Sequence, residues 1–185
     1  MNLRAQIREF NPWNEQEKKE KELIGSYMDQ FDNIFDRENE MVHMTASSWL
    51  VNKERTKVLM IYHNIYNSWA WTGGHADGDQ DLLNVAMKEA QEETGLIHVT
   101  PVTEDIFSLE ILGVNGHVKK GKFVGTHMHL NVTYLLEANE AEELRVKPDE
   151  NSGVKWVGLQ EAVELSTEPY MKEIYQKLNA KLKAR

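Results

Sequence analysis

The chain has 185 residues, of which 41% are hydrophobic, and its formal net charge is −9. This length suits one domain with additional segments and allows a sizeable hydrophobic core. The acidic balance argues against general affinity for nucleic-acid backbones or anionic membranes, so neither is expected as a partner. Because the chain has no cysteine, a structural disulfide, a cysteine zinc site and a thiol nucleophile are excluded.

The sequence also predicts where the protein works. No run of about 18 apolar residues is present, so no membrane span is expected. The segment from Met1 to Gln6 lacks the apolar run of a signal peptide. A cytoplasmic location is therefore the expectation.

The first predicted element is an amphipathic helix near the N-terminus. Asn14 can cap a helix that begins at Glu15 and continues to about Phe35. Its apolar residues follow helical spacing. We expect residues 1–40 to form a helical extension. It packs either on the core of its own chain, which is the commoner case, or on a second subunit in a homodimer.

From Met41 onward the pattern changes to strands. Thr45 to Asn52 and Lys57 to His63 are rich in β-branched and aromatic residues, and the residues between them read as a hairpin turn. Trp69 to Trp71 is a third, short strand that leads into a glycine pair. A helix follows from Asp81, and Gly95 is well placed to end it in a left-handed cap.

The second half of the chain continues the alternation of strands and helices. Gly113 to Gly125 holds four glycines and three lysines and reads as a turn or mobile loop. The other predicted elements are strands at Ile97 to Val102, Ile106 to Val114, Phe123 to Leu136 and Val154 to Gly158, and helices at Gln160 to Leu165 and Pro169 to Lys183. Together these elements predict an α/β fold with a mixed sheet between helical layers.

Three glutamates near the end of the central helix form the main candidate site. Glu89, Glu92 and Glu93 stand at positions i, i+3 and i+4, so they project from one stripe. Like charges at this spacing repel by roughly 0.2–0.5 kcal/mol per pair. A hard cation such as Mg²⁺, which prefers oxygen ligands, reverses that penalty. A solvated acidic helix end is the alternative.

The residues around this helix resemble the Nudix box. From Gly74 the spacing is five residues, Gln80, seven residues, Lys88-Glu89-Ala90, one residue, Glu92-Glu93, one residue and Gly95-Leu96. The spacing of the family motif fits without a gap, which makes this a specific signal. Gln80 and Lys88 depart from it, because the family has glutamate and arginine there.

The resemblance implies a Nudix-like α/β/α sandwich in residues 41–185, with helices added at both termini. It also implies roles for individual residues. Glu92 and Glu93 would bind Mg²⁺, or alternatively Mn²⁺, together with the carbonyl of Gly73. Glu89 would bind metal or act as the catalytic base. Many members draw a further acidic residue from outside the box, and Glu150 is the candidate for it, with a polar turn residue as the equal alternative.

Four other residues are candidates for contacts with substrate. His127 and His129 alternate on one predicted strand and share a face. They could bind zinc, but no third ligand is evident in the sequence, so we expect them to face substrate or to have a structural role. His75 follows the glycines and could contact metal or substrate, or only cap the helix. Trp71 could stack on a base or belong to the core.

The predicted function is metal-dependent cleavage of the pyrophosphate bond in a nucleoside diphosphate linked to another moiety, a small-molecule substrate. Two alternatives stay open. One is a Nudix-like ligand-binding or regulatory domain with little turnover, for which Gln80 and Lys88 are the supporting evidence. The other is an isopentenyl diphosphate isomerase, which shares the fold but in its best-known form relies on a cysteine.

Overall fold

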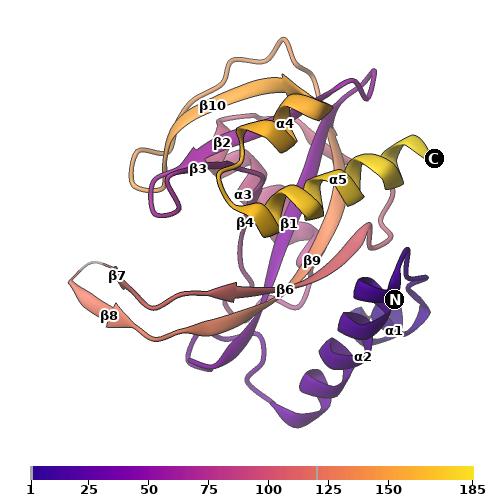
Figure 1. Cartoon of the computed structure of the whole chain (residues 1–185), viewed down its shortest axis with the longest axis vertical. Helices are drawn as coiled ribbons and strands as arrows, with labels where there is room; N and C mark the ends of the chain where they lie inside the picture. The colour runs from indigo at the N-terminus through magenta and orange to yellow at the C-terminus, as the bar shows by residue number, and fades with distance from the viewer. Residues whose placement is uncertain (1, 120) are drawn as a thin grey trace.

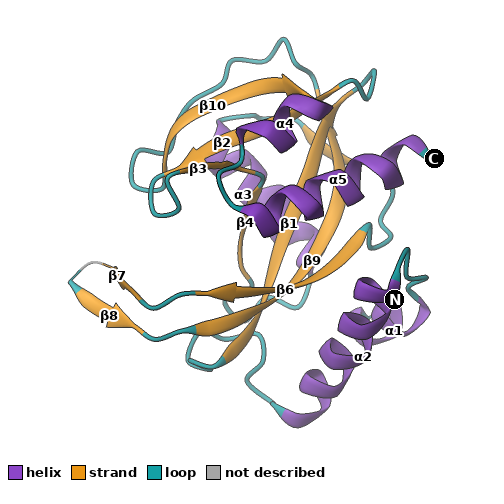
Figure 2. Cartoon of the chain, viewed as in Figure 1, coloured by secondary structure: helices purple, strands orange, loops and turns teal. Residues whose placement is uncertain are grey.

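The computed structural model describes residues 2–119 and 121–185. Within these ranges the fold is mixed α/β, with five helices packed around one large sheet (Figures 1 and 2). In chain order the elements are α1 Leu3–Glu9, α2 Glu15–Gln30, β1 Val42–Asn52, β2 Lys57–His63, β3 Ser68–Ala70, β4 Thr72–His75, α3 Leu82–Thr94, β5 Val99–Pro101, β6 Ser108–Val114, β7 His117–Lys119, β8 Lys122–Val124, β9 His127–Ala138, β10 Asn151–Gly158, α4 Leu159–Leu165 and α5 Pro169–Lys183.

The large sheet has the order β10-β2-β1-β9-β5, with β3 beside β2, β4 beside β1 and β6 beside β9. The central pair β1 and β9 runs parallel, with His43 opposite His129 and Thr45 opposite Asn131. The other neighbours in this sheet run antiparallel. The sheet is therefore mixed, and the predicted α/β class is confirmed.

Two hydrophobic clusters lie on the two faces of the sheet. Met44, Ala46 and Leu50 of β1 face a cluster that includes Leu82 and Ala86 of α3 and also α1 and α2. Trp49 and Val51 face a second cluster that includes Ile174, Tyr175 and Leu178 of α5. In Figure 1, α5 crosses in front of β1 and α3 lies behind it. This is the layered arrangement that the family resemblance implies.

The predicted helix boundaries are largely confirmed. Asn14 caps α2 by accepting a hydrogen bond from the amide of Glu17. Gly95 ends α3 with a φ of 77°, the left-handed conformation that favours glycine. Helix α5 has the predicted bounds. However, α2 ends at Gln30 rather than near Phe35, because the chain turns there and Ile34 packs in the core.

Three segments differ from the sequence-based expectation. The stretch predicted as one strand from Phe123 to Leu136 is divided into β8 and β9. The preceding loop is partly ordered, because β7 pairs with β8 in a hairpin that extends β6 and β9 outward from the sheet (Figure 2). The short helix α1 was not predicted, since seven residues are too few for a clear period.

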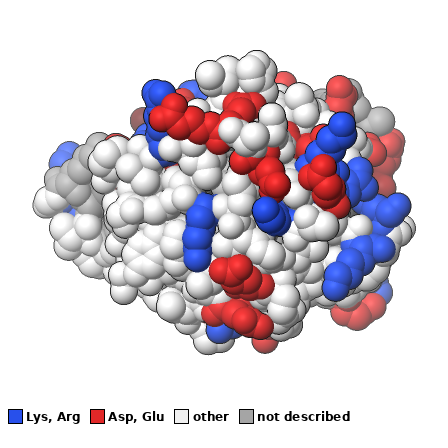
Figure 3. All heavy atoms as spheres, turned by 90° about the horizontal axis from the view of Figure 1, so that it is seen from above, with Lys and Arg blue, Asp and Glu red and all other residues white. Residues whose placement is uncertain are grey.

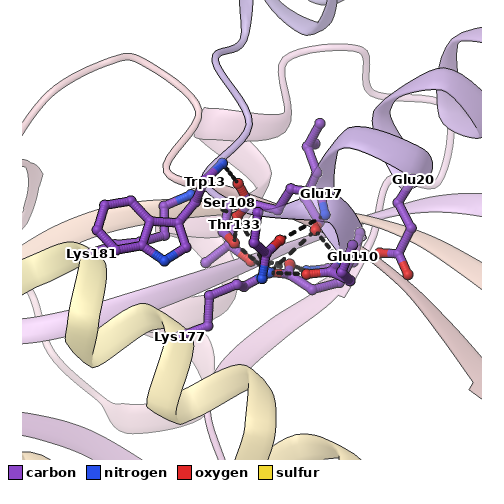
Figure 4. A network of polar contacts seen from close by, with 12 residues as sticks. Trp13, Glu17, Glu20, Ser108, Glu110, Thr133, Lys177 and Lys181 are labelled. Carbon is purple, nitrogen blue, oxygen red and sulfur yellow. Dashed lines mark hydrogen bonds and ion pairs between the residues drawn. The ribbon is translucent and has the colours of Figure 1, made fainter.

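A buried network of charges joins both terminal segments to the sheet (Figure 4). Glu17 of α2 accepts hydrogen bonds from Ser108 at 2.6 Å and from Lys181 of α5 at 2.6 Å. Lys177 of α5 donates to Glu110 of β6 at 2.9 Å. Both carboxylates have no exposed surface, and the two lysines balance them. The network therefore holds α2 and α5 against β6.

Residues 1–40 are predicted to form a helical extension. In the structure, α1 and α2 share one hydrophobic core with the sheet and α3. Helix α1 contributes Leu3 and Ile7 to the same cluster as β1 and α3, and α2 contributes Ile24 and Met28. None of the helices in the described ranges is both long and apolar enough to cross a membrane.

Candidate active site

A cavity of about 230 Å³ opens beside β4 and α3, and residues of β1, β6 and β9 also line it. Of the nine site residues predicted from the sequence, seven line it: Trp71, Gly73, His75, Glu89, Glu93, His129 and Glu150. The other two, Glu92 and His127, lie outside its lining. Residues that are up to 79 positions apart in the chain, Trp71 and Glu150, thus meet at one place.

Gly73 and Gly74 are glycines because their surroundings leave no room for a side chain. A Cβ on Gly73 would lie 2.5 Å from Oγ of Ser47 and 2.6 Å from the carbonyl oxygen of Ala46. A Cβ on Gly74 would lie 2.4 Å from Oε1 of Glu89. The first glycine lets β4 approach β1 closely, and the second lets the carboxylate of Glu89 lie against β4.

Glu93 is a buried residue whose carboxylate is hydrogen-bonded to the same strand, β4. It is 3% exposed, and its Oε2 accepts a hydrogen bond of 2.9 Å from the amide of Gly73. Burial raises its pKa well above the ordinary value. The Gly73 amide opposes the rise, whereas the charges of Glu89 and Glu150 add to it. The site therefore stores an unfavourable charge that a cation would neutralise.

Glu89 is the second carboxylate on the cavity wall. Burial raises its pKa, the charge of Lys147 opposes that rise, and the charges of Glu92 and Glu150 add to it. Two neighbouring carboxyl groups with raised pKa values are typical of functional sites, although ion-pair networks can also produce them.

Lys147 bridges two of the predicted acidic residues. Its Nζ lies 2.9 Å from Oε2 of Glu150 and 3.3 Å from Oε2 of Glu92. Burial alone would lower the pKa of Lys147, but the hydrogen bonds and charges of Glu150 and Glu92 outweigh it and raise the pKa. Glu92 is therefore drawn toward the rim, where it also pairs with Lys88 at 3.7 Å.

The two departures from the Nudix box lie outside the cavity. Gln80 and Lys88 are both exposed, and Lys88 pairs with Glu92 one helical turn away. Neither residue lines the cavity. The altered positions consequently leave the carboxylates at the cavity wall in place.

The residues on the cavity wall fit a hard divalent cation. Glu89, Glu93 and Glu150 offer carboxylate oxygens, the donors that Mg²⁺ prefers. The ammonium of Lys147 already takes the place of a cation between Glu92 and Glu150. The pKa values of Glu89 and Glu93 are raised chiefly by burial, and a bound cation would favour the ionised form of both groups.

Trp71 and the histidines are placed in different ways. Trp71 is 8% exposed and packs edge-on against Tyr175, with the ring centroids 5.7 Å apart, so it belongs to the core as well as to the cavity wall. His75 and His129 line the cavity, whereas His127 is buried behind them. Burial lowers the pKa of His129 to about 2, with further lowering by His75 and His43. The imidazole of His129 is therefore neutral at physiological pH.

Several residues at the cavity were not identified from the sequence. Arg37 lines the cavity and forms an ion pair with Asp77, which holds the pKa of that carboxyl below its usual range. Thr45 and Ser47 both donate hydrogen bonds to Oδ1 of Asn131, at 3.0 and 2.8 Å. The alternation of polar residues along each strand was the available signal. Only the parallel pairing of β1 with β9 brings the two polar faces together.

Comparisons with known proteins agree with this geometry. The NUDIX domain model matches residues 21–178. An RNA pyrophosphohydrolase from Pelagibacter ubique (strain HTCC1062) is 26% identical over 123 residues, which cover 65% of this chain and 77% of that protein.

Solved structures show the same fold. The C. elegans Ap4A hydrolase in a binary complex has a TM-score of 0.57 at 21% identity, covering 77% of this chain and 98% of that one. The E. coli dihydroneopterin triphosphate pyrophosphohydrolase has a TM-score of 0.54 at 13% identity, covering 72% and 92%. The resemblance seen at Gly74 to Leu96 is thereby confirmed over most of the chain, which belongs to the NUDIX family of hydrolases.

Proposed function

We propose that this enzyme is a Mg²⁺-dependent pyrophosphohydrolase that cleaves a nucleoside diphosphate linked to another moiety. The observation that carries the proposal is that Glu89, Glu93 and Glu150 line one cavity together with Gly73 and Gly74 of β4. Similar proteins act on phosphoanhydride bonds, in Ap4A, in dihydroneopterin triphosphate and in RNA, and Ap4A belongs to the proposed substrate class.

A free small molecule suits this chain better than an RNA end. The chain carries a net charge of −9. On the face drawn in Figure 3, acidic and basic side chains are interspersed, and a broad area carries neither. A tract of phosphates gains affinity from a continuous basic surface. We therefore assign two positive groups to the few phosphates of one substrate molecule: Arg37, which lines the cavity, and Lys147, which pairs with Glu150 of the cavity wall.

The Mg²⁺ ion would be held by Glu89 and Glu93 of the cavity wall, by the carbonyl of Gly73, and by Glu92 once it leaves its ion pairs with Lys147 and Lys88 at the rim. Its chemistry is polarisation of a phosphoryl oxygen and of the attacking water. The residues of the chain supply the rest. Arg37 and Lys147 neutralise phosphate charge, Glu89 or Glu150 accepts the proton of the water, and the exposed ring of Tyr66 at the cavity rim offers a surface for a base. Water attacks phosphorus, and two phosphate-bearing products leave.

A screen of nucleoside diphosphate-X compounds with Mg²⁺ tests the proposal, with phosphate released by an added phosphatase as the readout. We expect turnover of at least one compound and loss of that turnover in EDTA. Tight binding of one compound without turnover of any would support the regulatory alternative instead. Glu150→Gln then separates the two candidate bases: if Glu150 is the base, this variant keeps Mg²⁺ affinity but loses kcat, and if it keeps kcat, Glu89 is the base. Glu89→Gln removes a proposed ligand and should lower both Mg²⁺ affinity and kcat.

A second prediction concerns the glycine under Glu89. In Gly74→Ala, the new Cβ cannot coexist with the present position of the Glu89 carboxylate, 2.4 Å away. A flexible side-chain end can move, so we expect the fold to persist and kcat to fall about 10–100-fold, the range seen when a supporting contact of a metal ligand is lost. The measurement is kcat together with the melting temperature.

The matched control for this variant is Gly25→Ala in α2, where a new Cβ has no neighbour within 4 Å. It should keep full activity and gain stability slightly, because alanine favours helix. Full activity in Gly74→Ala would show that the position of the Glu89 carboxylate against Gly74 is not needed for catalysis.

A further inference from the structure

Four of the seven histidines in the chain gather in one group beside the cavity. His43 lies on β1, His75 on β4, and His127 and His129 on β9. The strand register places them, because His43 pairs with His129 across the parallel ladder and Thr45 pairs with His75 on the other side of β1. We call this group the four-histidine cluster.

The rings of the cluster converge on a common centre. Their centroids are 5.1 Å apart for His43 and His75 and 5.0 Å apart both for His43 and His127 and for His43 and His129. One nitrogen from each ring lies within 4.8 Å of the other three. The two Nε2 atoms of His127 and His129 are 3.1 Å apart.

The hydrogen bonds of the two buried rings occupy their Nδ1 atoms, and Nε2 of His127 faces Nε2 of His129. Nδ1 of His43 lies 2.9 Å from the carbonyl oxygen of Asn39, and Nδ1 of His127 lies 2.8 Å from that of Gly125. Because a carbonyl only accepts, each Nδ1 carries the proton and each Nε2 of the neutral ring carries a lone pair. A histidine that ligates a metal usually donates its other N–H in this way.

Nε2 of His43 is the most informative atom of the cluster. His43 is 4% exposed, and this nitrogen is buried without a hydrogen-bond partner in the part of the chain that the structure describes. A buried polar atom without a partner costs free energy, and in a native protein it calls for an explanation such as an ion.

From these contacts we propose that the four-histidine cluster binds one divalent transition-metal ion, with Zn²⁺ as the expected occupant. Four neutral nitrogen donors suit Zn²⁺ and its neighbours, whereas Mg²⁺ and Ca²⁺ prefer oxygen. A tetrahedral site with metal–nitrogen bonds of about 2.0–2.1 Å has nitrogens about 3.3–3.4 Å apart. Nε2 of His127 and Nε2 of His129 are already near that spacing.

The proposed ion differs from the one expected at the glutamates. Four protein ligands close the coordination sphere, as in structural zinc sites. Bound there, the ion would fix β1, β4 and β9 to one another at the cavity wall. It would thereby hold Gly73 and Gly74 of β4 in position. The one cation beside the cluster among the described side chains, Arg37, is already balanced by Asp77.

Metal binding by the full-length protein tests this proposal without any activity measurement. After EDTA treatment and removal of the chelator, Zn²⁺ is added in competition with a chromophoric indicator. We expect one equivalent to bind to wild type. Co²⁺ added in place of Zn²⁺ should give the intense visible absorption of tetrahedral coordination, which a six-oxygen site does not give.

Variants assign the ion to the cluster. His129→Gln and His127→Gln should each weaken Zn²⁺ binding at least about 10-fold and lose the Co²⁺ absorption, with melting curves confirming that both fold. His98→Gln, in an exposed histidine paired with Glu142, is the matched control and should bind as wild type does. Glu93→Gln should also retain this Zn²⁺.

Two outcomes would overturn the proposal. One is wild-type protein that takes up no stoichiometric Zn²⁺. The other is Zn²⁺ binding that Glu93→Gln removes and His129→Gln leaves unchanged, because the ion would then lie at the glutamates. Neither outcome bears on hydrolysis with Mg²⁺, so the two sites succeed or fail separately.

Discussion

Glu93→Gln is expected to abolish hydrolysis and, in metal-free protein, to leave the melting temperature equal to or higher than that of wild type. Glutamine keeps an oxygen that can accept the hydrogen bond from the Gly73 amide. It removes a charge that burial disfavours. Loss of outer contacts alone costs metal sites about 10–100-fold, so loss of a direct ligand should reduce activity by about 100-fold or more.

The pH dependence of this stability difference has a definite sign. The pKa of Glu93 is raised in the folded state above the ordinary value of 4.5. A raised pKa means that the protonated carboxyl stabilises the fold below pH 4.5 and that this contribution is lost as the pH rises. The stability advantage of Glu93→Gln over metal-free wild type should therefore grow as the pH rises above 4.5.

Melting curves with and without Mg²⁺ measure this prediction. Mg²⁺ should raise the melting temperature of wild type and should raise that of Glu93→Gln much less, since binding to the folded state alone is stabilising. Glu104→Gln, at an exposed position, is the matched control and should behave as wild type. Retained activity in Glu93→Gln would remove the assignment of this residue as a metal ligand.

Lys177→Met is expected to cause the largest loss of stability at a single position outside the cavity. Lys177 is 8% exposed, and its Nζ lies 2.9 Å from Glu110 and 3.3 Å from Glu17. Removing one partner of a buried ion pair leaves an uncompensated charge and costs about 3–5 kcal/mol. In a chain of this size each kcal/mol corresponds to about 2–4 °C in melting temperature.

Two further variants show whether the cost arises from the uncompensated charge. Lys183→Met changes an exposed lysine of the same helix and should leave the melting temperature nearly unchanged. Lys177→Met combined with Glu110→Gln restores neutrality and should recover part of the loss. If Lys177→Met were as stable as Lys183→Met, the network would not stabilise the attachment of α5.

The same network predicts sensitivity to acid. Burial alone would raise the pKa of Glu17, but the charges of Lys177 and Lys181 outweigh it and lower the pKa below 4.5. A lowered pKa means that the ionised carboxylate contributes stability above pH 4.5 and that this contribution is lost as the pH falls through the folded pKa. Wild type should thus lose stability below about pH 4.5 more steeply than Lys177→Met does, as chemical unfolding at several pH values would measure.

The sequence alone was sufficient for the elements whose signals are local. The period of apolar residues and the terminal glycine located α3, and the cap at Asn14 located the start of α2. The spacing from Gly74 to Leu96 identified the family. The glycines of β4 and the glutamates of α3 lie in one continuous stretch of the chain, so their spacing can be read from the sequence.

The tertiary structure decided every contact that joins distant parts of the chain. The pairing of β1 with β9 could have been parallel or antiparallel, and only the parallel register places His43 opposite His129. Arg37 of the cavity wall and Lys147, which pairs with Glu150 of that wall, lie in loops that carry no periodic signal. Charge pairs such as Glu17 with Lys181 are 164 residues apart, so the sequence could not distinguish them from exposed side chains. Local periodicity follows from backbone geometry, whereas the composition of a site follows from which strands become neighbours.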